Sequence, residues 1–338
     1  MQPTTSSIQL PILTKPTAAS PPAYQPPITS SDTESKWSQI LHTFKDHGKA
    51  VKSVAFSHDS TLIASGSDDR TVRIRRASTG ECVQTLMGHS NSVYSVAFSH
   101  DSVLIASTST DKTVQIWTTS TGECVRTLTG HTDWVNAVAF SHDSALIASA
   151  SDDKTVRIWS VSTGACVNIL EGHGRTVNSV VFSHNSTLVA SGANDKAVRI
   201  WRAGTSDCIQ TLTGHTEHVN SVAFSRDSTL IVSGANDKTV RIWRANDAGK
   251  YHYVKSLSGH TGWLTWIKSV ALSYDAKLVA SAADDKTVWI WDVATSECIQ
   301  VLKGHGRTVT SVAFSHDSGL IATGSNDKTV RIWRRSGV

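Results

Sequence analysis

Histidine, serine and aspartate recur through the chain at a constant spacing, and together these three side chains could form hydrolytic triads. In one copy of the pattern they are His89, Ser107 and Asp111. A serine hydrolase needs a single nucleophile in a cleft, next to an activating base and an oxyanion hole. A trio that is repeated in every copy, in the middle of regular strands, instead suits a buried polar network that rigidifies a sheet. We therefore expect a structural role for these residues, and no catalytic residue.

The spacing comes from a repeated unit that fills nearly all of the chain after residue 36. The histidine that opens each copy recurs after 42 residues four times and then after 45 residues twice, at His47, His89, His131, His173, His215, His260 and His305. A period of this length indicates an array of like structural units. Because all seven copies in the 338 residues share one pattern, we expect one closed array and not several separate domains.

Each copy contains short strands between polar turns, without sustained helical spacing. In the second copy the strands are expected at residues 93–99, 103–107 and 113–117, and the first of them is apolar on both faces. Radially stacked four-stranded blades have this pattern, since neighbouring sheets cover both faces. Residues 38–44 form a spare strand ahead of the first copy, and the last copy lacks its fourth strand. We therefore expect an all-β, seven-bladed β-propeller over residues 37–335, closed by pairing of this N-terminal strand with the last blade.

Composition limits the cellular compartment and the classes of partner that we expect for this protein. Residues 1–36 hold all seven prolines among serine and threonine, which predicts a disordered tail that is either featureless or a docking or phosphorylation segment. The net charge of +4 neither indicates nor excludes nucleic acid, because a binding track depends on the clustering of basic residues. Regularly spaced arginines on the third strands of different copies lack interleaved aromatic residues, so nucleic acid is not expected as a partner: Arg157, Arg199, Arg241 and Arg331. No signal peptide or membrane span is expected, which favours the cytoplasm or the nucleus and no membrane partner. The oligomeric state is left open.

Two further sets of side chains could carry chemistry. The cysteines occupy one equivalent position and are expected to be small, buried and reduced: Cys82, Cys124, Cys166, Cys208 and Cys298. Histidines in the turn between the first two strands could bind a metal or sense pH: His58, His100, His142, His184 and His316. Because these histidines belong to different blades, we expect separate, solvated turn residues and no metal site. The chain has neither GxxxxGK[ST] nor GxGxxG, so no cofactor is expected.

The Gly-His opening, the aspartate about 22 residues later and the tryptophan six residues after it resemble the WD40 repeat. The resemblance covers about residues 37–335 and implies a seven-bladed propeller. It also implies a structural tetrad in each blade, hydrogen-bonded from Trp to Ser or Thr to His to Asp. The implied tetrads are His89, Ser107, Asp111 and Trp117; His131, Ser149, Asp153 and Trp159; His173, Ser191, Asp195 and Trp201; His215, Ser233, Asp237 and Trp243; His260, Ser281, Asp285 and Trp291; and His305, Thr323, Asp327 and Trp333. The first copy departs from the pattern, with Asp46 for glycine and Arg75 for tryptophan, and its blade is expected to be the weakest.

The near-identity of the copies, with runs such as SVAFS, SDDKTVRIW and TGEC, is most similar to the WD40 propellers of fungal NACHT-type heterokaryon incompatibility proteins. This resemblance implies a non-catalytic scaffold or recognition module that binds a partner protein or peptide. The alternatives are an adaptor subunit of a larger assembly, such as a mitochondrial division adaptor, a ubiquitin-ligase substrate receptor or a chromatin reader. A hydrolase is the least favoured alternative.

The copies differ mainly two, three and five residues after the histidine and just before the tetrad aspartate. Family geometry implies that the last three of these positions face the entrance of the central channel, and loops on a rigid scaffold often carry recognition. The candidate binding residues, here called the rim, are Lys52, Tyr94, Trp134, Asn136, Asn178, His218, Asn220, Trp263, Trp266, Lys268, Asp68, Asp152 and Asp284. Tyr94 and Trp134 are the expected anchors, because aromatic residues dominate binding hot spots. The alternative is unconstrained drift at exposed sites. Trp263 and Trp266 lie in an insertion of the sixth copy, and form either a contact knob or a loop folded onto the blade.

Overall fold

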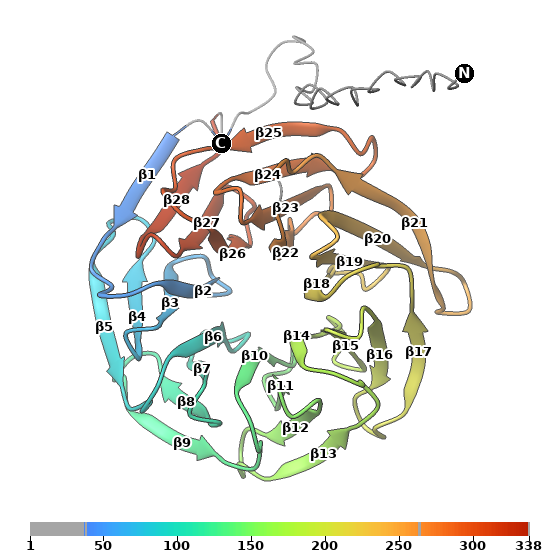
Figure 1. Cartoon of the computed structure of the whole chain (residues 1–338). Helices are drawn as coiled ribbons and strands as arrows, with labels where there is room; N and C mark the ends of the chain where they lie inside the picture. Colours follow the sequence, from blue (N-terminus) through green and yellow to red (C-terminus); the bar gives the residue numbers. More distant parts are fainter. Residues whose placement is uncertain (1–36, 38, 263–264, 337–338) are drawn as a thin grey trace, which may run out of the picture.

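Seven four-stranded sheets surround a central axis in the computed structural model, which describes residues 37, 39–262 and 265–336 (Figure 1). Within these residues all 28 strands belong to the seven sheets, every strand pairing is antiparallel, and there is no helix. The prediction of an all-β, seven-bladed propeller is therefore confirmed. The predicted tail, residues 1–36, lies outside the described residues.

Each of the first six blades is built from four consecutive strands, in order from the channel outward. The first three blades are β2 (Val51–Phe56), β3 (Leu62–Ser67), β4 (Thr71–Arg76) and β5 (Cys82–Met87); β6 (Val93–Phe98), β7 (Leu104–Ser109), β8 (Val114–Thr118) and β9 (Cys124–Leu128); and β10 (Val135–Phe140), β11 (Leu146–Ser151), β12 (Val156–Ser160) and β13 (Cys166–Leu170). The next three are β14 (Val177–Phe182), β15 (Leu188–Ala193), β16 (Val198–Arg202) and β17 (Cys208–Leu212); β18 (Val219–Phe224), β19 (Leu230–Ala235), β20 (Thr239–Ala245) and β21 (Tyr251–Ser258); and β22 (Ile267–Leu272), β23 (Leu278–Ala283), β24 (Val288–Asp292) and β25 (Cys298–Leu302).

The hydrophobic core lies between blades. One cluster joins Ala64 and Ile74 of the first blade to Val93, Val96 and Trp117 of the second, and the same arrangement recurs around the ring. The second strand of each blade is buried almost throughout, because a neighbouring sheet covers each of its faces. A blade therefore has no complete core of its own, and each sheet stabilises the next.

The seventh blade combines the two ends of the described chain. It contains β26 (Val309–Phe314), β27 (Leu320–Ser325) and β28 (Val330–Arg334), and its outer strand is β1 (Gln39–Phe44), which pairs antiparallel with β28. Trp37, just before β1, is 1% exposed and packs with residues of the last two blades. Its backbone N–H donates to Gln300 Oε1 at 2.7 Å, and its carbonyl accepts from Gln300 Nε2 at 2.9 Å.

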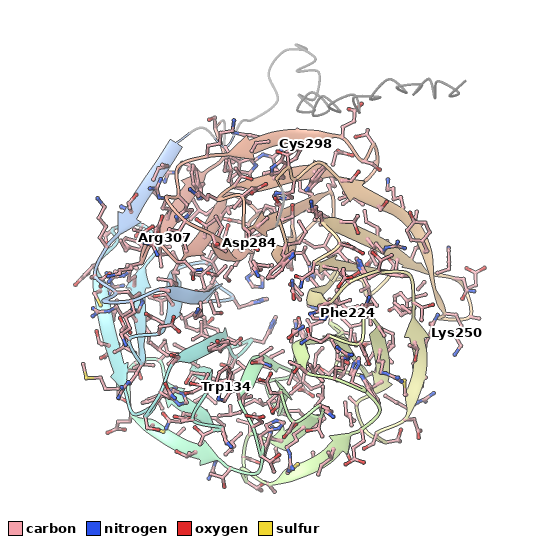
Figure 2. All side chains as sticks on the ribbon, viewed as in Figure 1. Trp134, Phe224, Lys250, Asp284, Cys298 and Arg307 are labelled. Atoms are coloured by element: carbon pink, nitrogen blue, oxygen red, sulfur yellow. The ribbon has the colours of Figure 1, made fainter. Side chains whose placement is uncertain are left out.

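The expected burial of the cysteines is wrong. Four of the five are exposed and Cys298, labelled in Figure 2, is half-buried, because each begins the outermost strand of its blade. This strand packs on one side only, so its first residues face solvent, as the exposed pattern of β9 illustrates. Burial raises the pKa of the Cys298 thiol to about 11.

Candidate functional site

The structural tetrads join a loop, a turn and two strands in the second to seventh blades. In the second to seventh blades His Nδ1 lies 2.7–2.9 Å from Asp Oδ2, and His Nε2 lies 2.7–2.8 Å from the Ser or Thr hydroxyl. The indole Nε1 donates to the same hydroxyl at 2.8–3.0 Å. Since an indole only donates and a carboxylate only accepts, the hydroxyl must donate to His Nε2, and His Nδ1–H must donate to Asp.

These bonds leave little capacity for catalysis. The serine hydroxyl accepts a hydrogen bond from the indole and donates one to the imidazole. Neither the serine hydroxyl nor the imidazole is therefore free to act on a substrate. Burial acts to raise the pKa of Asp111, but hydrogen bonds from His89 and Thr113, together with the electrostatic interaction with His89, lower it to about 2. The arrangement therefore provides an ionised, saturated clamp that ties the loop before each blade to its second and third strands.

The first blade has a shortened clamp. His47 still bonds Asp69 and Ser65, each at 2.8 Å, but no indole in the described part of the chain donates to this serine. Arg75 takes the place of the indole, is 6% exposed and pairs with Asp46. Its guanidinium carbon lies 4.7 Å from the centre of the Phe44 ring on β1. Both departures from the repeat pattern in this blade thus contact each other.

The rim positions lie at one end of the channel. Successive antiparallel strands reverse direction, so the loop before the first strand and the turn between the second and third strands emerge at the same end of a blade. Backbone hydrogen bonds join them: Asp152 N donates to Trp134 O at 2.9 Å, and Asn236 N donates to His218 O at 2.8 Å. The residue before the tetrad aspartate and the third residue after the histidine are therefore neighbours in six blades, and Trp266 takes the place of the latter in the sixth blade, six residues after His260.

Side chains of the first three blades meet on the rim around Tyr94. The Tyr94 and Trp134 ring centres are 6.3 Å apart, and Lys52 Nζ lies 5.5 Å from the Tyr94 ring centre. Lys52 Nζ also lies 3.2 Å from Asp68 Oδ2. Burial, and then the charges of Asp68 and Asp152, raise the pKa of Tyr94, so its hydroxyl keeps its proton. Trp134, labelled in Figure 2, is 45% exposed and offers an apolar surface beside this charged pair.

Three asparagines of the rim join neighbouring blades. Asn136 Nδ2 donates to Asp152 Oδ1 at 2.7 Å and to the Val177 carbonyl of the next blade at 3.0 Å. Asn178 and Asn220 make equivalent bonds to the Val219 and Ile267 carbonyls, both at 2.7 Å. Their amide hydrogens are thus used within the ring, which gives these three positions a scaffold contact that repeat comparison alone does not reveal.

The sixth blade contributes a second aromatic and charged group to the rim. Lys268 Nζ lies 4.5 Å from the Trp266 ring centre and 3.4 Å from Asp284 Oδ2. Asp284 also accepts a 3.0 Å hydrogen bond from Thr308 of the last blade. Trp266 is 38% exposed, so it rests against its lysine and still presents a face to solvent. Trp263 lies outside the described residues.

The turn histidines are the residues whose arrangement the sequence analysis missed. Adjacent rings are in contact around the axis, with centres 3.5 Å apart for His58–His100, His100–His142 and His142–His184, and 3.8 Å for His58–His316. The expectation of separate, solvated residues is therefore wrong, since all five are half-buried in one group, the histidine ring. A shared position at the inner end of the first strand was the signal that could have found it, because these ends converge on the axis. These turns lie at the opposite end of the channel from the rim.

Comparison with known proteins gives one family and short stretches of similarity. The family described as "WD domain, G-beta repeat" matches residues 38–75, 80–118, 122–160, 164–202, 206–244, 251–292 and 296–334. Vegetative incompatibility protein HET-E-1 of Podospora anserina is 47% identical over 52 residues, which are 15% of this chain and 4% of that protein. Protein Mut11 of Chlamydomonas reinhardtii is 49% identical over 47 residues, which are 14% of this chain and 13% of that protein. The aligned stretches thus cover only a small part of each relative.

Proposed function

Because the chain belongs to the WD40 family, whose propellers are generally protein-interaction scaffolds and typically non-catalytic, we propose that it is a recognition module that binds a partner protein or peptide on the rim. The observation that carries this proposal is the group of Lys52, Asp68, Tyr94 and Trp134. It places a half-exposed indole beside a protonated phenol and a paired lysine. An aromatic surface of this kind, on rigid strands, is typical of a binding hot spot.

The chemistry of this group indicates the kind of segment that would bind. Trp134 offers an apolar face for an aliphatic or aromatic side chain of the partner. Asp68 and Asp152 lie close enough to Tyr94 to affect its ionisation, so a donor on the partner, such as a lysine or a backbone N–H, would find acceptors beside that apolar contact. The rim group at Trp266, Lys268 and Asp284 provides a second contact of the same composition.

The saturated tetrads support a non-catalytic role, because each serine and aspartate is already committed to the blade. The similarity to HET-E-1, a protein named for vegetative incompatibility, supports a place for this module in a fungal recognition system of that type. In such a system the rim would detect the partner and the ring would supply the rigid frame.

The proposal is tested by capture of partners with the purified full chain, followed by cross-linking and peptide mapping. Tyr94→Ala/Trp134→Ala is the test variant. Val167→Ala/Ile299→Ala is the matched control, because it removes two exposed apolar side chains from outer strands. We expect the test variant to lose a specific partner that the parent and the control retain, with cross-links to rim residues. Equal capture by all three folded proteins, or cross-links confined to the outer strands, would contradict the proposal.

A further inference from the structure

A circuit of side chains surrounds the axis at the channel end opposite the rim. The histidine ring supplies five of its members, and Arg226 and Tyr274 occupy the equivalent turns of the fifth and sixth blades. The Arg226 guanidinium carbon lies 4.2 Å from the Tyr274 ring centre, and that ring lies 5.7 Å from the His316 ring. Five imidazoles and one permanent cation thus face a single opening, beside which Figure 2 labels Phe224.

The backbone holds this circuit in place. The N–H of each of five turn histidines donates to the serine hydroxyl of the next blade's turn: His58 to Ser102, His100 to Ser144, His142 to Ser186, His184 to Ser228 and His316 to Ser60, at 2.9–3.2 Å. Tyr274 N makes the same bond to Ser318 at 3.0 Å. The turns that carry these histidines and Tyr274 are therefore held in place by their neighbours, which lowers the ordering needed to bind an ion there.

The space enclosed by the circuit is able to hold a ligand. It forms a cavity of about 220 Å³, lined by the histidine ring, Arg226 and phenylalanines of the inner strands. His316 Nδ1 is buried without a hydrogen-bond partner among the described residues. Buried polar groups are rarely left without a partner, so this nitrogen points to a missing ligand or water.

The charges around the cavity favour an anion over a cation. Among the described residues no acidic side chain forms an ion pair with Arg226. The aspartates of the turns are committed locally: Asp59 Oδ1, for example, accepts from Ser57 Oγ at 2.6 Å and from Thr61 N at 3.0 Å. No group of His, Cys, Asp and Glu in the described part of the chain has an arrangement suited to a metal ion.

We propose that this cavity binds a small multivalent oxyanion of the phosphate or pyrophosphate class, held by Arg226 and by imidazoles of the histidine ring that take up protons as the anion enters. Arg226 supplies the permanent charge. The imidazole N–H groups, including His316 Nδ1–H, donate hydrogen bonds to the oxygens of the anion. This site is independent of the rim, which lies at the other end of the channel.

Proton uptake follows from the electrostatics of the empty site. Burial, then the neighbouring histidines and Arg226, lower the pKa of His58 to about 4; burial and neighbouring histidines lower that of His100 to about 4. The pKa values of His142, His184 and His316 are lowered too, with burial the largest cause, whereas Asp101, Asp143 and Asp317 act to raise those of His100, His142 and His316. The ring is therefore mostly neutral at neutral pH. A bound anion attracts the protonated imidazoles and so offsets the electrostatic effects that disfavour protonation. The anion and the protons therefore bind together, and anion binding strengthens as pH falls.

The test is isothermal titration of the full chain with inorganic pyrophosphate at pH 5.5 and pH 7.5, and with inorganic sulfate, whose charge does not change between these pH values, in two buffers of different ionisation enthalpy. One linked proton on the protein changes affinity by up to about tenfold per pH unit, so we expect sulfate to bind at least tenfold more tightly at pH 5.5, with measurable proton uptake by the protein. Arg226→Gln should weaken binding about tenfold or more, as loss of a charged hydrogen-bonding partner does. Arg244→Gln, which removes an exposed arginine on β20, is the control with the same change in net charge and should bind like the parent.

Three results would overturn the proposal. The first is the absence of pyrophosphate binding at pH 5.5 by the folded parent. The second is equal weakening in Arg226→Gln and Arg244→Gln, which would indicate unspecific attraction to a basic protein. The third is stoichiometric uptake of Zn²⁺ by the parent that pyrophosphate does not affect and that His100→Gln abolishes, because the ring would then be a metal site.

Discussion

Asp46 and Arg75 of the first blade show how two residues of the repeat depend on each other. In the second blade the glycine before the tetrad histidine lies under the indole, and a Cβ on Gly88 would come within 2.8 Å of Trp117 Cη2. In the first blade Asp46 stands where that glycine would be, and Arg75 replaces the indole and pairs with it. Glycine with tryptophan, and aspartate with arginine, are thus two alternative matched pairs.

We predict that Asp46→Gly/Arg75→Trp raises the free energy of unfolding by about 1–2 kcal/mol, because it supplies the missing indole donor to Ser65. Arg75→Trp alone should lower it, since the indole would meet the Asp46 side chain. Urea unfolding of the parent, both single variants and the double variant measures these differences. A gain in stability from Arg75→Trp alone would contradict the matched-pair interpretation.

At the scale of elements, β1 depends on Trp37 for its attachment to the last two blades. Trp37 is buried against the last two blades and bonded to Gln300 through both backbone groups, whereas Ile40 within β1 is exposed. We predict that Trp37→Ala lowers the free energy of unfolding by about 3–5 kcal/mol, as large-to-small changes in a core do. Ile40→Ala is the control and should change it by less than about 1 kcal/mol. Similar melting temperatures for the two variants would show that closure of the seventh blade does not depend on this contact.

Most strands could be predicted along the chain from the sequence, but their distances from the propeller axis could not. The strands expected at residues 93–99, 103–107 and 113–117 are observed as β6, β7 and β8, with ends shifted by one or two residues. Strand alternation and turn residues are local signals, so they can be read from one copy. The exposure of Cys124 and the contact of His100 with His142 depend on distance from the axis, because the outer strands face solvent whereas the ends of the inner strands converge. The 42-residue spacing is the same for residues close to the axis and for residues far from it, so it does not distinguish them.

At the scale of the whole molecule, acid should destabilise the ring in two stages. The pKa values of His58 and His100 are lowered from 6.5 to about 4, with burial the largest cause, so protons bind first to the unfolded chain and stability falls between pH 6.5 and 4. The pKa values of Asp111 and Asp237 are lowered from 3.8 to about 2 despite burial, through bonds to their histidines, so their contribution is complete above pH 3.8 and is lost toward pH 2. Melting temperatures from pH 7 to pH 2 would show both stages.

Variants of the histidine ring test whether its residues cause the first stage of acid destabilisation. His58→Asn/His100→Asn should flatten the pH dependence between 6.5 and 4 and leave the stage below pH 4 unchanged. His252→Asn removes an exposed imidazole on β21 and is the control. An unchanged slope in the double variant would assign the first stage to other groups.

The pairing of β1 with β28 also has a consequence for biosynthesis. β1 is the first of the described strands to leave the ribosome and β28 is the last, yet they are neighbours in one sheet. At about 5–20 residues per second, β1 waits for roughly 15–60 s before its partner is made. During that interval the nascent first blade has no seventh blade against which to pack, and it exposes apolar residues that the finished ring hides. A chaperone that shields this face until β28 has been made would therefore act on the earliest blade.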